Sequence, residues 1–231
     1  MCGRFTLRAI DRIKLRLSNA QQLPLDAFSP RYNIAPSQDV LAVISQEGTA
    51  TPAWMRWGLI PSWSNEPKGF INARAETVER KPSFSESFER RRCLIPADGF
   101  YEWPRHKLTR QPYYFQLRDE TPFAFAGLWD HWQQNGVSIN SCAIVTTAAN
   151  ELLAPIHDRM PVILTAEAQD EWLRAHDDPT ELKGLLSPYP PAEMKSHPVS
   201  RRVNYPDNDD QELVEPVKLI EEPQTGMLFD L

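Results

Sequence analysis

The chain has 231 residues, of which 41% are hydrophobic, and its formal net charge at pH 7 is −6. This length fits one large domain with a buried core, and no apolar stretch reaches the roughly 18 residues that a membrane span requires. The N-terminus lacks a secretory signal pattern, the three cysteines form no C-x-x-C pair, and the five histidines show no H-x-x-x-H spacing. We therefore expect a reducing, cytoplasmic compartment, no disulfide framework, and no metal or cofactor.

The negative charge is concentrated at the C-terminal end of the chain. Residues 207–231 hold eight acidic residues and one basic residue, which leaves residues 1–206 with a net charge of +1. A nearly neutral body is compatible with nucleic acid. The basic residues between Arg74 and Arg92 are interleaved with glutamates, so they also fit a solvated, salt-bridged surface. We expect one domain over residues 2–206, followed by an acidic tail over residues 207–231.

The predicted elements begin with a helix over residues 9–19, where apolar side chains recur at helical spacing. A short apolar run then predicts a strand over residues 39–45, and a second strand is expected to run from the turn at Glu47-Gly48 toward Trp57. Further strands are predicted over residues 93–96, 99–103, 112–118, 123–129 and 137–147. Glu47-Gly48 and Asn135-Gly136 are typical hairpin turns. A second helix is expected over residues 166–174, with Trp172 and Leu173 facing inward. Many short strands with a few helices predict a single α+β domain of curved antiparallel sheets or a partial β-barrel.

Cys2 directly follows the initiator methionine. Methionine is commonly removed before a small residue, and its removal would leave the α-amine and the thiol of Cys2 on adjacent carbons. Such an aminothiol condenses with an aldehyde and closes a five-membered thiazolidine ring, which no internal cysteine can do. Alternatively, a cysteine occupies this position by chance, as a small residue. Cys2 alone does not distinguish the two interpretations.

Three more positions are candidates for chemistry. If residues 70–77 are extended, Asn72, Arg74 and Glu76 share one face, although a solvent-facing strand edge shows the same pattern. Glu102 is flanked by aromatic residues, which would raise the pKa of its carboxyl group if it is buried and leave it unperturbed if it points outward. His157 lies between two prolines in a stiff loop, where it fits either a proton shuttle or a structural histidine.

Two rigid apolar tips are expected on loops, at Pro36 and at Trp63. Such side chains stack on bases or wedge the end of a duplex. They also serve simply to pack loops, and their positions alone do not distinguish the two roles.

The sequence resembles the SRAP (SOS response-associated peptidase) family, whose members shield abasic sites in single-stranded DNA by cross-linking to them. The resemblance runs in order from residue 2 to about residue 206, through five specific blocks and a later His197-Pro198-Val199-Ser200. The five blocks are Met1-Cys2-Gly3-Arg4, Arg56-Trp57-Gly58-Leu59-Ile60-Pro61-Ser62-Trp63, Asn72-Ala73-Arg74, Ala97-Asp98-Gly99-Phe100-Tyr101-Glu102-Trp103 and Ile156-His157-Asp158-Arg159-Met160-Pro161. No single block is specific, but the five in register are.

The resemblance implies a role for each matched residue. Cys2 supplies the amine and the thiol, Asn72 positions them, and Glu102 and His157 move protons during sugar ring opening and imine formation. The DNA contacts that it implies come from Arg4, Asn33, Pro36, Trp63, Arg74 and Arg159, and the two last-named arginines bind phosphates. It also implies a monomer that acts on single-stranded DNA, with peptidase activity limited to removal of its own first residue.

Two other functions stay open at this point. Glutamine amidotransferases with an N-terminal nucleophile also begin with Cys-Gly after trimming, although they normally feed a second domain. A single-stranded DNA-binding module without catalysis is the other alternative. In addition, the segment from Gln224 to Phe229 resembles a short peptide that binds a sliding clamp, although a packed or frayed chain end has the same composition.

Overall fold

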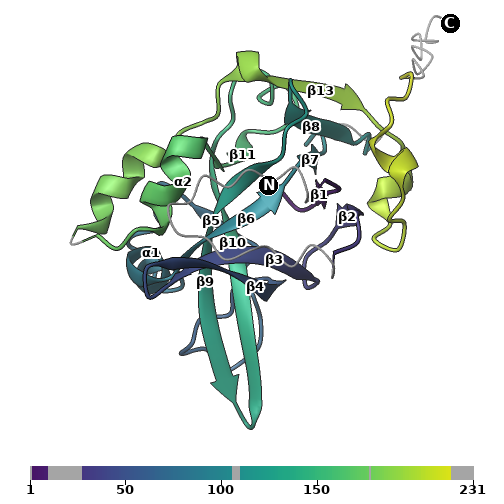
Figure 1. The fold of residues 1–231 in the computed structure, drawn as a ribbon. Coiled ribbons are helices and arrows are strands. Elements are labelled where there is room, and N and C mark those ends of the chain that lie inside the picture. Colours follow the sequence, from purple (N-terminus) through teal and green to yellow (C-terminus); the bar gives the residue numbers. More distant parts are fainter. Residues whose placement is uncertain (1, 10–27, 106–109, 177, 220–231) are drawn as a thin grey trace, which may run out of the picture.

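A computed structural model describes residues 2–9, 28–105, 110–176 and 178–219 of the chain (Figure 1). The helix expected over residues 9–19 and the peptide from Gln224 to Phe229 lie outside these residues, apart from Ala9. Two curved sheets form most of the described fold, with short helices at their periphery. The predicted single α+β domain with a partial barrel is therefore confirmed.

The larger sheet has eight strands, and part of it closes into a barrel. Strand β10 pairs in parallel with β4 and antiparallel with β9, so the path β4-β3-β6-β9-β10 returns to its start. The β9–β10 hairpin extends well beyond the rest of the molecule (Figure 1). The strands are β3 Asp39–Gln46, β4 Thr49–Trp57, β5 Asn72–Arg74, β6 Arg92–Ala97, β9 Phe123–Gln134, β10 Val137–Ala148, β11 Arg159–Pro161 and β12 Ile163–Leu164.

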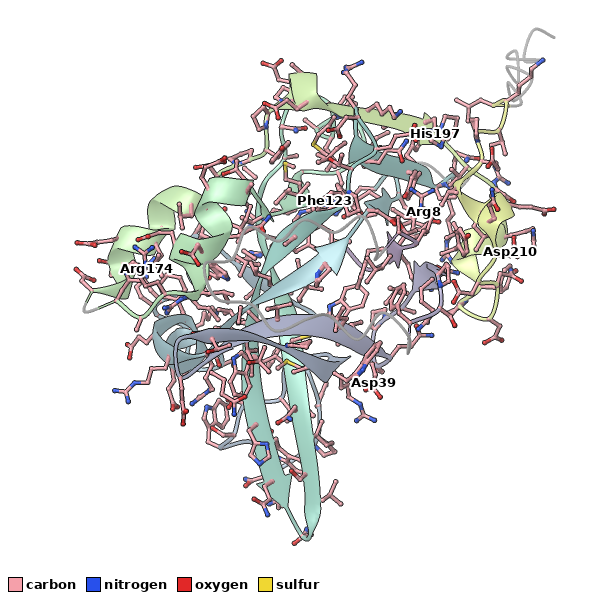
Figure 2. All side chains as sticks on the ribbon, viewed as in Figure 1. Arg8, Asp39, Phe123, Arg174, His197 and Asp210 are labelled. Carbon is pink, nitrogen blue, oxygen red and sulfur yellow. The ribbon has the colours of Figure 1, made fainter. Side chains whose placement is uncertain are left out.

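The smaller sheet has five strands in the order β13-β8-β7-β1-β2. Aromatic rings join it to the larger sheet: Phe5 contacts Trp57, and Phe100 contacts Phe125, with ring centroids 5.1 and 6.1 Å apart. These edge-to-face contacts fill the interior between the sheets, where Phe123 also lies (Figure 2). The strands are β1 Phe5–Leu7, β2 Arg31–Ile34, β7 Gly99–Glu102, β8 Tyr113–Leu117 and β13 Met194–Pro198.

Helix α2 packs against the larger sheet through Trp172, which is fully buried and donates its indole N–H to the carbonyl of Cys93 on β6. Its N-terminus is capped by the Thr165 hydroxyl, as expected for a helix that starts at Ala166. Leu173 is also buried, so the predicted inward face is correct. The described helices are α1 Ser85–Arg90, α2 Ala166–Leu173 and the 3-10 helices η3 Pro179–Leu185, η4 Pro191–Glu193, η5 Arg201–Asn204 and η6 Gln211–Val214.

Both predicted hairpin turns are present. The φ angles of Glu47 and Gly48 are 52° and 79°, and those of Asn135 and Gly136 are 51° and 77°. Two consecutive positive φ angles define the type I′ turn, whose twist matches the flanking strands. The Asn135-Gly136 turn therefore sets the register of the long β9–β10 hairpin, in which Val137 lies opposite Gln134.

The first residues of the expected acidic tail, from Asp207 to Val217, contact the folded unit. Asp209 accepts the backbone N–H of Tyr32, Leu213 is fully buried, and the N–H of Val217 donates to Pro198 at the end of β13. Asp209 binds two backbone donors of β2, and Asp210 caps η6 and pairs with Arg202. The folded part of the chain therefore extends at least to Val217.

Candidate functional site

Cys2 is held in place by the strand that follows it. Phe5, the first residue of β1, packs on Trp57 in the core, and the carbonyl of Arg4 accepts the backbone N–H of Tyr101 on β7 at 3.0 Å. These contacts fix the backbone on the C-terminal side of Cys2. The side chain of Cys2 is fully buried, and burial, with Glu102 nearby, raises the pKa of its thiol well above the usual range.

A buried carboxylate fastens β1 to the turn between β6 and β7. Asp98 accepts hydrogen bonds from the Thr6 hydroxyl and from the backbone N–H of Arg8. The turn needs Gly99, because a Cβ atom there would lie 2.0 Å from the Tyr114 hydroxyl. The Ala97-Asp98-Gly99 block thus positions the segment that carries Cys2.

Asn72 contacts Cys2 directly. It begins β5, which pairs in parallel with β10 opposite Ile144, and its Nδ2 donates to the Cys2 carbonyl at 2.9 Å. That bond fixes the orientation of the amide, because a carbonyl oxygen only accepts. The other end of the amide, Oδ1, is buried and has no hydrogen-bond partner among the described residues. A buried acceptor of this kind is suited to an amine.

Glu102 ends β7 and is buried on the same side of the site. Its carboxyl group is 2% exposed, and burial raises its pKa from 4.5 to about 7. The negative charge of the same carboxyl group contributes to the raised pKa of the Cys2 thiol. The side chain can therefore donate a proton near neutral pH, whereas an ordinary glutamate cannot.

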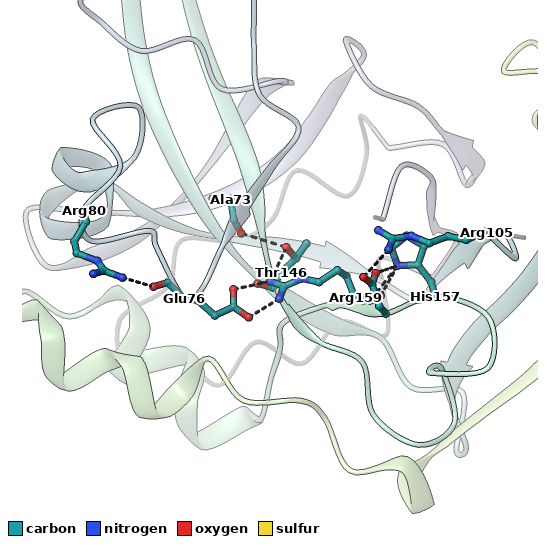
Figure 3. Close-up of polar contacts among 8 residues, drawn as sticks. Ala73, Glu76, Arg80, Arg105, Thr146, His157 and Arg159 are labelled. Atoms are coloured by element: carbon teal, nitrogen blue, oxygen red, sulfur yellow. Dashed lines mark hydrogen bonds and ion pairs between the residues drawn. The ribbon is translucent and has the colours of Figure 1, made fainter.

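His157 lies in the loop between β10 and β11 and is also buried. The Arg105 guanidinium nitrogen Nε lies 3.1 Å from its Nε2, and the backbone nitrogen of Arg159 lies 3.0 Å from its Nδ1 (Figure 3). Burial lowers the pKa of His157 to about 4, and the positive charge of Arg105 contributes to the shift. The ring is therefore neutral at pH 7.

The pKa values of these two groups lie in the reverse of their usual order. Glu102, with a pKa near 7, holds its proton better than His157, with a pKa near 4. Divergent environments of this kind assign an acid and a base at a catalytic site. This arrangement lets the carboxyl group donate a proton near neutral pH and leaves the imidazole free of one.

Arg159 and Glu76 form an ion pair at the edge of the site. Both terminal nitrogens of the guanidinium bind the Glu76 carboxylate, and Nη2 also donates to the Thr146 carbonyl (Figure 3). The expectation that Asn72, Arg74 and Glu76 share one strand face is wrong, because β5 ends at Arg74 and the chain turns there. Arg74 itself is exposed.

Arg4 and Asn33 bind the C-terminal segment of the fold. The Arg4 guanidinium donates to Asn33 Oδ1 at 3.1 Å and to the Val203 carbonyl at 2.6 Å. Asn33 is fully buried, and its Nδ2 donates to the carbonyls of Val203, Tyr205 and Asn208. The Asn33 amide therefore connects the Arg4 guanidinium to the C-terminal segment.

Replacement of Asn33 by alanine is expected to lower the free energy of unfolding by about 1–3 kcal/mol, because a buried amide that binds Arg4 and three backbone carbonyls is lost. Urea denaturation measures the change. Asn140→Ala, at an exposed asparagine of the β9–β10 hairpin, is the matched control and should stay within about 0.5 kcal/mol of the parent. Equal losses in the two variants would contradict the structural role of Asn33.

Trp63 and Pro36 lie on separate loops. Trp63 is 61% exposed, and its indole N–H donates to the Pro82 carbonyl. The ends of its loop approach closely, since a Cβ atom at Gly69 would lie 2.1 Å from the Gly58 carbonyl oxygen. Pro36 is half-buried in a turn whose next residue, Ser37, has a φ angle of 70°. Trp63 is thus an exposed aromatic side chain on a firmly closed loop.

Two other features of the described residues bear on function. No helix among them is long and apolar enough to cross a membrane. In the same part of the chain, no three His, Cys, Asp or Glu side chains are grouped closely enough to hold a metal ion.

Comparison with known proteins identifies the family. The family described as SOS response associated peptidase (SRAP) matches residues 1–206. The chain belongs to the SRAP family. Among its SRAP relatives, "Abasic site processing protein YoqW" of Bacillus subtilis is 46% identical, and the match covers 93% of this chain and 99% of the relative. "Abasic site processing protein YedK" of Escherichia coli is 32% identical, with 94% of this chain and all of the relative covered.

Solved structures show the same fold. A crystal structure of a protein from Bacteroides thetaiotaomicron is 26% identical to this chain and superposes with a TM-score of 0.81, covering 94% of this chain and 100% of that one. A protein from Bordetella bronchiseptica is 25% identical, with a TM-score of 0.71, and the match covers 86% of this chain and 100% of that one.

The structure brings together four of the residues that the SRAP resemblance assigned to chemistry. Asn72 bonds to Cys2, Glu102 acts on the Cys2 thiol, and Arg105 links His157 to Glu102 electrostatically. Sequence reasoning missed Arg105, which lies outside the five matched blocks. Its only signal is its position three residues after Glu102.

Proposed function

We propose that the chain forms a thiazolidine cross-link between Cys2 and the aldehyde of an abasic site in single-stranded DNA, and thereby shields the lesion during the response to DNA damage. The names of the SRAP relatives support abasic-site processing. The observation that carries the proposal is the arrangement at Cys2, where Asn72 presents a buried acceptor and Glu102 an acid with a pKa of about 7.

The reaction requires removal of Met1. In the untrimmed chain the nitrogen of Cys2 belongs to a peptide bond, so no amine is available. After trimming, the new α-amine becomes a donor next to Asn72, whose Oδ1 is a buried acceptor. We infer that Asn72 orients this amine, and that the peptidase activity implied by the family name is limited to this self-processing step.

Glu102 supplies the proton that opens the sugar. An abasic deoxyribose is mostly a closed hemiacetal, and protonation of its ring oxygen releases the C1′ aldehyde. Because the pKa of Glu102 is about 7, a large fraction of the carboxyl group still carries its proton at neutral pH. An ordinary chain-terminal α-amine has a pKa of about 7.7–8.0, so part of it is neutral at pH 7 and can attack C1′.

Imine formation and ring closure complete the cross-link. Attack of the amine gives a carbinolamine, which loses one water to form the imine. The thiol of the same residue then adds to the imine carbon, and its proton passes to the nitrogen, so that one water is released overall. Neutral His157 accepts and returns protons in these steps. Ring closure is intramolecular and gains an effective molarity of up to about 10⁵–10⁸ M, so it does not depend on a thiolate.

The natural substrate is single-stranded DNA, because an unpaired sugar can reach the terminal amine of Cys2, which precedes β1. Arg74 and Arg159 bind phosphates on either side of the lesion, and Trp63 and Pro36 contact bases. A phosphate must compete with Glu76 for Arg159, whereas Arg74 is exposed. We therefore assign the larger share of phosphate binding to Arg74.

Arg74→Gln is expected to weaken binding of an unmodified single-stranded oligonucleotide and to reduce the slope of log K against log salt concentration by about 1. Fluorescence anisotropy at several salt concentrations measures both. Arg174→Gln, at an exposed arginine beyond the end of α2 (Figure 2), is the matched control. A slope that is the same in the two variants would remove Arg74 from the phosphate contacts.

Intact-protein mass spectrometry tests the proposed function. The protein is incubated with single-stranded DNA that contains one abasic site, and we expect the mass of the chain without Met1 plus the oligonucleotide minus one water. Peptide mapping should place the adduct on Cys2. An oligonucleotide with a tetrahydrofuran abasic analogue, which lacks the aldehyde, should give no adduct. A trimmed chain that forms no adduct, or an adduct elsewhere, would refute the proposal.

A further inference from the structure

Arg105 joins the loop after β7 to the loop before β11. Its Nε donates to His157 Nε2 at 3.1 Å, and its Nη1 donates to the Asp158 carboxylate at 2.5 Å (Figure 3). The Arg105 side chain is 45% exposed, whereas the His157 side chain is 6% exposed. A surface guanidinium therefore contacts a buried imidazole from outside, and the carboxylate of Asp158 holds it in that position.

Both nitrogens of the His157 ring face donors. Arg105 donates toward Nε2, and the backbone N–H of Arg159 is directed at Nδ1. A neutral imidazole has one N–H and one lone pair, so each neutral tautomer accepts one of these donors. A doubly protonated ring accepts neither, and it places two cations in contact. The Asp158 carboxylate, 3.2 Å from Nδ1, favours the tautomer that carries its proton there and leaves the Nε2 lone pair to Arg105.

We propose that Arg105 is a positioning residue that keeps His157 neutral and occupies its Nε2 lone pair, so that His157 accepts a proton only when the guanidinium turns away. The base role of His157 rests on the proposed function, but the effect of Arg105 on the ring does not. The outward position of Arg105 lets it turn without disturbing the buried groups. Asp158 then retains the Nδ1 proton, and Nε2 becomes the basic atom.

Other charged groups act on the ring as well, and the positive charge of the chain N-terminus lowers the pKa of His157 more than Arg105 does. Asp158 acts on His157 from its own loop, and Glu102 at the end of β7 is influenced by the same Arg105 guanidinium. The α-amine that trimming creates on Cys2 is a further titratable group at the site. Because Arg105 lowers the pKa of both His157 and Glu102, its removal should raise both pKa values.

Titration of His157 by NMR in the absence of DNA tests the inference. In the parent protein the pKa is expected near 4, and in Arg105→Gln it should rise by about 1 unit, because one neighbouring positive charge is lost while burial remains. Arg105→Lys retains the charge without the Nε donor, so it should restore most of the low pKa. Arg118→Gln, at an exposed arginine that binds backbone carbonyls near η4, should leave the titration unchanged.

The same variants separate this inference from the proposed cross-link. If Arg105→Gln leaves the pKa of His157 where it was, the inference is wrong, whatever the protein does to DNA. If the pKa rises as expected, the inference stands even where no adduct forms. In a protein that cross-links, Arg105→Gln should also move the acidic limb of the pH–rate profile, set by His157, and the alkaline limb, set by Glu102, to higher pH. Limbs that stay at the same pH would overturn the inference.

Discussion

Cys2→Ala is expected to form no heat-stable adduct with abasic single-stranded DNA. The thiazolidine needs an amine and a thiol on adjacent carbons, and alanine retains only the amine after Met1 is removed. A Schiff base can still form, so we expect a borohydride-trappable adduct and slow strand cleavage to survive. Denaturing gel electrophoresis after heating, with and without borohydride, distinguishes the two kinds of adduct.

Cys142→Ala is the matched control for this substitution. Cys142 lies on β10, is as fully buried as Cys2 and, like it, is a free thiol. Its loss should leave the yield of heat-stable adduct unchanged, because an internal cysteine has no α-amine. A heat-stable adduct that persists in Cys2→Ala, or disappears in Cys142→Ala, would show that another residue forms the cross-link.

Local sequence signals predicted the elements whose structure is local. The Asn135-Gly136 turn and the apolar runs around it predicted β9 and β10, because a type I′ turn between two apolar runs suffices to define a hairpin. Strand β1 was not predicted, since three residues carry no periodicity and Phe5–Leu7 becomes a strand only by pairing with β2 and β7. Its position nevertheless decides where Cys2 lies.

The chemistry of the site was predictable only through the family resemblance. Spacing alone left Glu102 between a buried acid and an outward carboxylate, and the structure decides for burial. The prediction that Asn72 and Glu76 share one strand face was wrong, because the turn after Arg74 depends on contacts outside the segment. Acidic composition predicted a tail from residue 207, and it carries no signal for the bonds that Asp209 makes to backbone donors of β2, which is distant in sequence.

Glu102→Gln is expected to slow cross-linking by roughly 10²–10⁴-fold without abolishing it, which is the usual contribution of one positioned acid or base. Glutamine preserves the size and polarity of the side chain but cannot donate a proton to the sugar ring oxygen. Single-turnover rates from pH 5 to pH 9 measure the effect. The parent should lose rate as pH rises above about 7, where Glu102 ionises, and the variant should lack this limb. Glu89→Gln, at an exposed glutamate of α1, should match the parent.

The same substitution should stabilise the fold at alkaline pH. Folded Glu102 keeps its proton up to pH about 7, whereas the unfolded chain releases it near 4.5, so the parent loses stability as pH rises between these values. This difference in pKa corresponds to about 3 kcal/mol of free energy of unfolding. The Glu102→Gln variant has no carboxyl group to ionise, so its stability does not fall by this amount. Urea denaturation at pH 4 and pH 8 should therefore show a variant whose advantage appears only at the higher pH. A substitution that merely damaged the site would lower both the rate and the stability. A variant that reacts more slowly but folds more stably therefore shows that the buried Glu102 carboxyl group serves as a proton donor at a cost in stability.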